Sequence, residues 1–297
     1  MLRSILVGLD GSAHADAAAA LGRRWAKAAD ALLVGQAVVD EPDITAPELV
    51  PMGAAYFTGE RDEQQLADAR RAAGAVLDRF SAACADAGVR SKVHLDTGDP
   101  AEILLRQAQR YDLVVLGAET HFRPGPDGAA CDTLDRVLHS PPRPVVAVPE
   151  RLPGGQTVVI GYDGSLQAAR TVAAFVGTGL ARAFETVVVT IDEDYEEAGR
   201  IAGRAVEYLS LHGIAVTTVP VETRLDPAAV LLDHSARLDA QLLVMGAFGH
   251  SALREFFFGS TTRSVLRGST VPVMLYHSRD HPRGAGLSST FSSSCSG

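Results

Sequence analysis

The sequence predicts an α/β fold built from two open, five-stranded parallel sheets, one in each half of the chain. Short apolar runs alternate with helical stretches throughout, an order typical of parallel strands joined by helical crossovers. The same landmarks occur twice. An apolar run enters Asp-Gly-Ser at Asp10 and again at Asp163, and a later run ends at Gly117 and again at Gly246. The first pair is 153 positions apart and the second 129, so the first copy carries about 24 additional residues.

Short apolar runs mark the predicted strands, and their length is typical of strands covered by helices on both faces. In the first half they span residues 5–9, 31–39, 89–95, 113–116 and 145–148. In the second half they span residues 157–162, 186–191, 214–221, 242–245 and 271–276. Between the second set, helices are expected near residues 165–182, 193–212 and 227–238.

The helix start signals are also repeated. Ser12 and Ser165 each stand where a helix N-cap is needed. Asp99 and Asp226 are each followed by a proline, which combines a capping side chain with proline at the first helical position. The two halves therefore share local signals as well as strands.

The repeat also predicts the domain boundaries. We expect one domain over residues 1–149 and a second over residues 156–277, joined by a short linker rich in Pro and Gly. The insertion falls around residues 41–60 and contains three prolines, which predicts an ordered or partly ordered surface loop, either a lid or a tolerated insertion. The serine-rich tail, residues 278–297, is expected to be disordered.

Composition limits the partners. A net charge of -9 argues against nucleic acid or an anionic membrane surface as the main partner, and no apolar run is long enough to span a membrane. Three cysteines without metal-like spacing argue against a disulfide framework or a zinc site. The first residues lack the pattern of a signal peptide. We therefore expect a cytoplasmic protein with no resident metal, no nucleic-acid partner and no membrane insertion.

Beyond Gly246, the second half continues into a glycine loop. Gly249 follows after two residues and Gly259 after nine more. Three hydroxyl residues then open a predicted helix: Ser260, Thr261 and Thr262. Glycines let the backbone approach phosphate oxygens, and the free N–H groups of a helix start favour an anion. His250 lies inside the loop and either contacts phosphate or is a surface residue.

Asp163 is predicted to lie near the same loop, because ligands of open parallel sheets bind beyond the carboxyl ends of the strands. Its carboxylate can accept a hydrogen bond from an adenine amino group or a ribose hydroxyl. The alternative interpretation is that Asp163 and Asp10 only cap the helices that follow them.

The two Asp-Gly-Ser openings, the five-strand alternation and the Gly-x2-Gly-x9-Gly-Ser loop resemble the universal stress protein family in its tandem, two-domain form, over about residues 2–149 and 157–276. The resemblance implies an adenine nucleotide alpha hydrolase-like fold with strand order 3-2-1-4-5 in each domain. It also implies that the last strands of the two domains pair antiparallel, here as an intramolecular pseudo-dimer.

The resemblance further implies an adenine-nucleotide site in the second domain, with ATP and Mg²⁺ as the expected ligands. It assigns Asp163 to adenine, and Gly246 and Gly249 to ribose and phosphate. The other residues that it implies for the site are Tyr162, Thr190 within the base-edge segment 189–191, Met245, His250, Gly259, Ser260, Thr261 and Thr262.

The first half departs from this pattern. Alignment of Gly117 with Gly246 puts Thr120, Ala130 and Cys131 where Gly249, Gly259 and Ser260 stand. Two prolines in the intervening segment lack N–H donors. We expect weak or no nucleotide binding there, although Asp10 and Gly117 are retained. A rearranged phosphate nest around Gly125 and Gly128 is the alternative.

Taken with the resemblance, the sequence favours a stress-response regulatory protein whose nucleotide-bound and empty forms present different surfaces to a protein partner. The alternatives are a slow ATPase, a nucleotide-transferring enzyme, or a scaffold that binds no nucleotide. The chain has no Gly-x4-Gly-Lys-[Ser/Thr] P-loop, and Asp163 and Glu255 are the acidic candidates near the glycine loop, so no catalytic residue is assigned. Association of two chains as a homodimer is a further alternative to a single chain.

Overall fold

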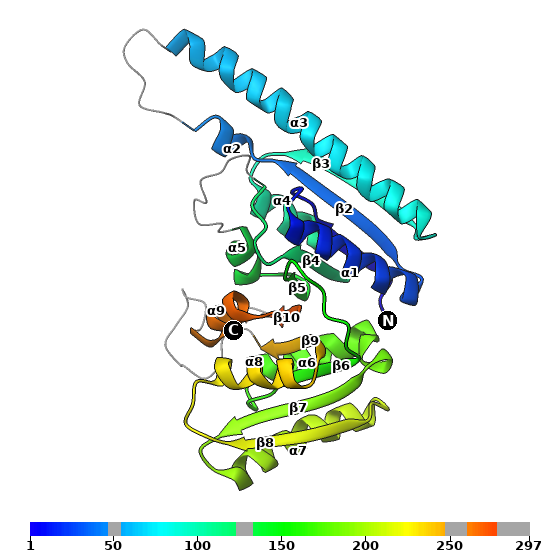
Figure 1. Cartoon of the computed structure of the whole chain (residues 1–297), viewed down its shortest axis with the longest axis vertical. Helices are drawn as coiled ribbons and strands as arrows, with labels where there is room; N and C mark the ends of the chain where they lie inside the picture. Colours follow the sequence, from blue (N-terminus) through cyan, green and yellow to red (C-terminus); the bar gives the residue numbers. More distant parts are fainter. Residues whose placement is uncertain (47–54, 123–132, 247–259, 278–297) are drawn as a thin grey trace, which may run out of the picture.

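The computed structural model describes residues 1–46, 55–122, 133–246 and 260–277. Each half contributes five strands to one ten-stranded sheet with the order β3-β2-β1-β4-β5-β10-β9-β6-β7-β8 (Figure 1). Neighbouring strands within each half are parallel, whereas β5 and β10 pair antiparallel at the centre of the sheet. The predicted fold class, strand order and intramolecular pseudo-dimer are therefore confirmed.

Each strand lies within two residues of its predicted ends. The first half contains β1 (Ser4–Gly8), β2 (Leu32–Val39), β3 (Ser91–Thr97), β4 (Leu113–Gly117) and β5 (Val145–Val148). The second half contains β6 (Thr157–Gly161), β7 (Glu185–Asp192), β8 (Val216–Glu222), β9 (Ala240–Gly246) and β10 (Val273–Tyr276). The short apolar runs fixed these positions because both faces of each central strand are buried.

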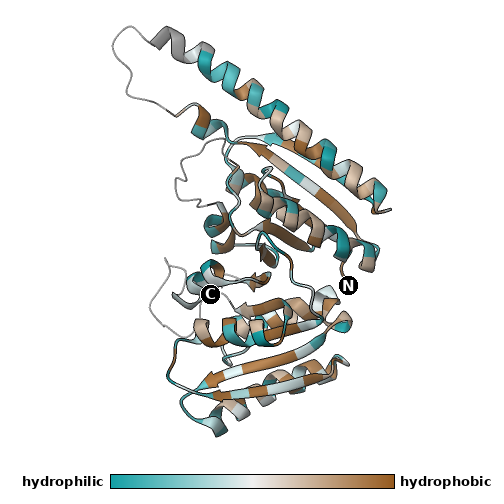
Figure 2. Cartoon of the chain, viewed as in Figure 1, coloured by the Kyte–Doolittle hydropathy of each residue, from teal (hydrophilic) through white to brown (hydrophobic). Residues whose placement is uncertain are grey.

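Helices cover both faces of the sheet. One face, called the α1 face, carries α1 (Ala13–Ala29), α3 (Ala55–Asp86), α6 (Leu166–Thr178) and α7 (Tyr195–Leu211). The other, called the α4 face, carries α4 (Pro100–Ala108), α5 (Thr133–His139), α8 (Pro227–Arg237) and α9 (Ser260–Gly268). Strand residues alternate between the two apolar clusters: Ile160 packs on the α1 face and Val159 on the α4 face. Figure 2 shows the hydrophobic colour along most strands of the sheet.

The predicted caps are present. Ser12 Oγ accepts a hydrogen bond from the Ala15 N–H at 3.1 Å, and Ser165 Oγ accepts one from the Ala168 N–H at 3.1 Å. Asp99 and Asp226 cap α4 and α8, each ahead of a proline in the first turn. The second-half helix predicted over residues 165–182 ends earlier, at Thr178, because Gly179 adopts a left-handed conformation and a 3-10 turn (Leu180–Ala183) follows.

The insertion was predicted as a loop over residues 41–60, and that prediction is wrong in part. Residues Glu41–Ile44 form the short helix α2, with a proline tolerated in its first turn, and α3 already begins at Ala55. α3 has 32 residues, whereas its counterpart α7 has 17. In Figure 1 the amino-terminal part of α3 runs past the end of the sheet. Much of the inserted length is therefore helical. Residues 47–54 lie outside the described residues, as does the tail 278–297.

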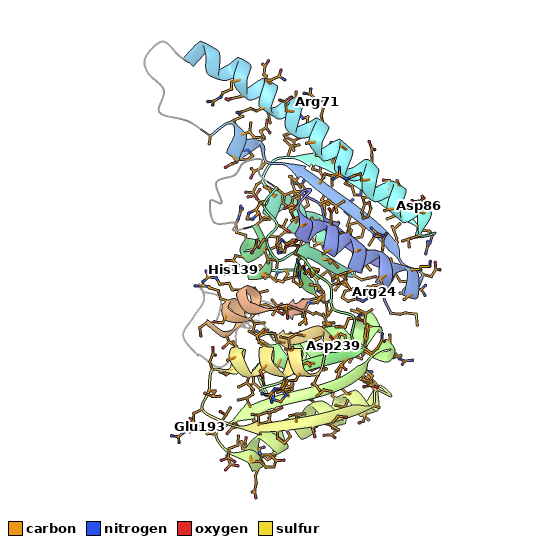
Figure 3. All side chains as sticks on the ribbon, viewed as in Figure 1. Arg24, Arg71, Asp86, His139, Glu193 and Asp239 are labelled. Carbon is orange, nitrogen blue, oxygen red and sulfur yellow. The ribbon has the colours of Figure 1, made fainter. Side chains whose placement is uncertain are left out.

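Several contacts among the described residues join the halves. Antiparallel pairing aligns Val145 with Leu275. The Leu2 N–H donates to the Thr178 carbonyl at 2.8 Å, which ties the start of the chain to the end of α6. Arg24 lies near the junction (Figure 3), with its Nη1 and Nη2 atoms 3.0 and 2.8 Å from the Gln241 side-chain oxygen in the amide orientation that satisfies both groups. Among the described helices, none has the length and apolarity that a membrane span requires.

Candidate functional site

Asp10 and Asp163 occupy matching turns at the carboxyl ends of β1 and β6. In each turn, the aspartate Oδ1 accepts a hydrogen bond at 2.9 Å from the backbone N–H of the serine two residues later. The glycine between them has a φ of 82° in the first half and 75° in the second, a conformation that glycine adopts without strain. Because Ser12 and Ser165 cap the helices, the aspartates shape the turns and do not themselves cap the helices.

Gly117 and Gly246 end the strands beside these turns and are required by packing. A Cβ on Gly246 would lie 2.7 Å from the Ala168 backbone nitrogen and 2.9 Å from the Gln167 carbonyl carbon. A Cβ on Gly117 would lie 2.7 Å from the Cβ of His14. In both halves the first turn of a helix packs directly on the strand end. This close packing explains why a glycine is needed at each position without any ligand.

An apolar row lies across three strand ends on the α4 face of the second half. Gly161 is in register with Val189 on one side and Met245 on the other. Val189 and Met245 are buried in the apolar cluster of that face, and Leu231 of α8 approaches within 3.0 Å of the position of a Gly161 Cβ. We call this row, with Asp163 two residues beyond its centre, the second-half trough. Its chemistry suits the apolar face of a planar ring.

The matching row of the first half is partly polar. Gly8 is in register with Gln36, and the Leu116 side chain crowds its other side. Gln36 is fully buried, and its Nε2 donates to Asp96 Oδ2 at 3.0 Å, which also accepts from Gln107 Nε2 at 3.3 Å. The positions of Gln36 and Asp96 are taken in the second half by Val189 and Val221. We call the row Gln36, Gly8 and Leu116 the first-half trough.

Phe122 covers the first-half trough. Its side chain is 5% exposed, and its ring Cζ lies 3.3 Å from the position that a Gly8 Cβ would occupy. The residue before it, His121, donates its backbone N–H to Asp10 Oδ2 at 2.6 Å. The strand-end aspartate of the first half therefore has a protein donor on each oxygen. Sequence comparison of the halves identified the missing glycines but not this side chain.

The start of α9 presents two hydroxyl residues outside the core. Ser260 is exposed and Thr261 half-buried, whereas Thr262 is buried. The first N–H groups of a helix have no partner within it, and no acidic residue stands in the first turn of α9. This helix start can therefore receive an anion through backbone N–H groups with Ser260 and Thr261 beside them.

The side chains of Tyr162 and Thr190 point away from the second-half trough. Tyr162 is 8% exposed in the cluster of the α1 face, and burial raises the pKa of its hydroxyl, partly offset by the charge of Arg204. Thr190 follows Val189 on β7, so its side chain also lies on the α1 face, fully buried, without a hydrogen-bond partner among the described residues. These two residues can contact a ligand in the trough through their backbone atoms. Gly249, His250 and Gly259 lie outside the described residues.

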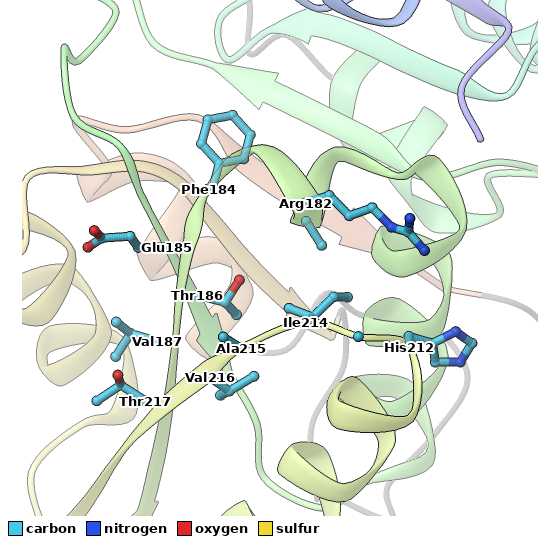
Figure 4. Close-up of a pocket in the computed structure, with 12 residues that line it drawn as sticks. Arg182, Phe184, Glu185, Thr186, Val187, His212, Ile214, Ala215, Val216 and Thr217 are labelled. Carbon is cyan, nitrogen blue, oxygen red and sulfur yellow. The ribbon is translucent and has the colours of Figure 1, made fainter.

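A pocket of 660 Å³ lies elsewhere in the second half (Figure 4). It is lined by the first residues of β7 and β8 and by the turns before them, including Arg182, Thr186 and His212. These are the amino ends of the strands, whereas Asp163 follows the carboxyl end of β6. The lining brings no group of acidic side chains or paired cations together, and we assign no site to it.

The comparisons with known proteins agree with the fold. A model of the universal stress protein family matches residues 1–149 and again residues 155–277. A universal stress protein of Mycobacterium tuberculosis is 27% identical over 299 residues, which cover 91% of this chain and 96% of that protein. A universal stress protein of Synechocystis is 27% identical over 168 residues, 56% of this chain, and the match spans 58% of its length.

Among solved structures, the crystal structure of a universal stress protein from Archaeoglobus fulgidus superposes with a TM-score of 0.65 at 20% identity, covering 92% of this chain and 97% of that chain. At this identity the likeness concerns the fold alone. It extends over both halves of the sheet.

Proposed function

Because the chain belongs to the universal stress protein family, we propose that its second half binds an adenine nucleotide and that the protein acts as a nucleotide-dependent regulator. The observation that carries the proposal is the second-half trough: Gly161 between Val189 and Met245, with Asp163 just beyond it. An apolar row without a central side chain, next to a carboxylate, offers stacking for a purine and an acceptor for its amino group.

In the proposed complex the base lies against the backbone of Gly161 and of Val189–Ile191, and Asp163 accepts a hydrogen bond from the base or the ribose. The phosphates lie at the start of α9, where backbone N–H groups, Ser260 and Thr261 supply donors. Gly246, Gly249 and Gly259 let the backbone approach the ligand. Mg²⁺ enters with ATP, bound mainly to its phosphates.

Calorimetry on the intact chain tests the proposal. ATP, ADP, AMP and adenosine are titrated in the presence of Mg²⁺, and nucleotide released by heat denaturation is identified and counted. We expect one adenine nucleotide per chain, lost in the variant Gly249→Val/Gly259→Val, whereas two per chain would contradict an asymmetric pair of halves. The matched control is Gly125→Val/Gly128→Val in the first half, which should bind as wild type does. If wild type shows no binding at millimolar ATP and carries no nucleotide, the scaffold alternative is correct.

We propose that the nucleotide acts by being bound and not by being turned over. A steady-state assay of phosphate release separates the two classes. The proposal predicts turnover much slower than the exchange of bound nucleotide. Rapid, saturable hydrolysis that Gly259→Val abolishes would instead make the protein an ATPase.

We further propose that a protein partner contacts the rim of the second-half trough. Three large apolar side chains are exposed where helices begin beyond β6, β7 and β8: Leu166, Tyr195 and Leu225, at 58%, 56% and 68%. Light scattering with and without ATP tests whether a second chain is the partner. A cytoplasmic location remains a prediction that cell fractionation would test.

A further inference from the structure

The first-half trough is filled by the chain itself. The Phe122 ring is buried in the apolar cluster of the α4 face together with Leu104 and Leu116, the residues that also surround Gly8. Its ring Cζ lies 3.3 Å from the position of a Gly8 Cβ, between Leu116 Cδ2 at 2.5 Å and Leu104 Cδ2 at 3.8 Å in order of distance. In the second half the corresponding row is the place proposed for the base.

The backbone of the same segment donates a hydrogen bond to the Asp10 carboxylate in the turn after β1. The His121 N–H donates to Asp10 Oδ2 at 2.6 Å, a short hydrogen bond to a charged acceptor. The Thr120 hydroxyl, fully buried, donates to the Gly117 carbonyl at 2.8 Å and so fixes the start of the segment. An N–H donor and an aromatic ring thus occupy the acceptor and the apolar surface that an aminopurine would use.

Phe122 holds an unfavourable backbone conformation in order to reach this place. Its φ is 41°, in the left-handed region that side chains other than those of glycine, asparagine and aspartate seldom adopt. Such a conformation persists only when the surrounding contacts determine it. Here the ring in the trough and the bond from His121 to Asp10 supply those contacts.

We propose that Thr120–Phe122 is a built-in occupant of the first-half trough, in which the Phe122 ring stands in place of a purine and the His121 N–H in place of its amino group. The first half is thereby closed to nucleotide, and removal of the ring opens a cryptic site for an adenine base. The proposal takes the ligand class from the proposed function of the second half and otherwise rests on residues of the first half.

The test is titration of the intact chain with adenosine, which has a base and a ribose but needs no phosphate loop. The variant is Phe122→Gly, because glycine removes the ring and tolerates a positive φ. The matched control is Phe122→Leu, which keeps an apolar side chain over Gly8. We expect one binding event in wild type and in Phe122→Leu, and a second event in Phe122→Gly. A single event in a natively folded Phe122→Gly, or two events in wild type, would overturn the proposal.

The outcomes also separate this proposal from the proposed function. If wild type binds no adenosine but Phe122→Gly gains one event, the occupant is real and the second-half site is not. If Phe122→Gly does not fold, hydrogen exchange of wild type decides the matter. The His121 amide should exchange as slowly as amides inside α1, and saturating ATP should leave its rate unchanged. Exchange at the rate of an unprotected amide would show that the segment does not occupy the trough.

Discussion

The two halves place a glycine at the same point of the sheet but differ in what lies on it. Gly8 lies beside the buried polar Gln36 and beneath Phe122. Gly161 lies beside Val189 and Met245, and Leu231 of α8 is its close neighbour. The strands and turns around the glycine are the same in both halves, whereas the residues that a base would contact are different.

This difference separates residues that the fold needs from residues that a ligand needs. Asp10 holds the turn after β1, and Gly117 lets α1 press on the end of β4, so both have a structural reason without any ligand. The positions that changed between the halves, such as Gln36 and its equivalent Val189, line the troughs and not the turns. A retained strand-end aspartate is therefore weak support for a site, and the side chains around the trough are stronger support.

Crowding the strand-end glycines should have the largest effect. Gly246→Val and Gly117→Val each force a side chain into helix atoms less than 3 Å away, and each should lower the free energy of unfolding by about 2 kcal/mol or more. Only Gly246→Val should also abolish ATP binding. Denaturant unfolding and calorimetry measure the two effects. Loss of ATP binding in a folded Gly117→Val would mean that the halves do not differ as described.

Removal of the turn carboxylates comes next. Asp10→Ala and Asp163→Ala each lose a charge-assisted hydrogen bond to a serine N–H, so each should cost about 1–3 kcal/mol of stability. Asp163→Ala should also weaken ATP binding by about tenfold or more, for the loss of one ligand hydrogen bond to a charged acceptor. Asp10→Ala should leave the ATP affinity unchanged. Equal weakening by both variants would contradict the asymmetry of the two troughs.

The junction between the halves gives a smaller effect. Arg24→Ala leaves the buried Gln241 oxygen without its guanidinium donor, and we expect a loss of about 1 kcal/mol in the free energy of unfolding. Lys27→Ala, an exposed change on the same helix, is the control and should stay within about 0.5 kcal/mol of wild type. Two separate unfolding transitions in Arg24→Ala would show that this contact couples the halves.

The smallest effect concerns an ion pair between α4 and α5. Asp99 lies 2.6 Å from Arg136, and both are partly exposed. Burial alone would raise the pKa of Asp99, but the hydrogen bonds from Arg136 and from the Glu102 N–H outweigh it and lower the pKa. A lowered pKa stabilises the fold above the unfolded value of about 3.9, and this stabilisation is lost as the pH falls through the folded value.

Asp99→Asn should therefore be less stable than wild type by about 0.5–1 kcal/mol at neutral pH, a modest figure because solvent screens the pair. The difference should be constant from about pH 5 to pH 7 and shrink below about pH 4. Urea unfolding at several pH values measures it. A difference that grows as the pH falls would show that the carboxylate is not stabilised by its neighbours.

Much of the fold could be predicted from the sequence, because its signals are local. Apolar runs fixed the ten strands, and Ser12, Ser165 and the Asp-Pro pairs fixed four helix starts. The insertion was harder. Its prolines suggested a loop, but a proline in the first turn of α2 is compatible with a helix, and α3 extends well before its core contacts Leu77 and Phe80.

The candidate site could be predicted only in part. The alternation of side chains along a strand predicts that Thr190 points to the opposite face from Val189. The family resemblance named Thr190 as a site residue but did not give the direction of its side chain. Phe122 gave no signal, because it belongs to no strand or helix and its partners Gly8 and Leu104 are distant in sequence. Its role depends on tertiary packing, which a motif comparison between the halves does not contain.

The asymmetry of the two halves is tested most directly by hydrogen exchange of the intact chain with and without saturating Mg²⁺-ATP, since one experiment reports on both troughs. We predict slower exchange in peptides containing Gly161–Asp163, Val189–Ile191 and Ser260–Thr262, and no change in those containing Gly8–Asp10 or Gly117–Phe122. Equal protection around Asp10 and Asp163, or protection around Asp10 alone, would contradict the account.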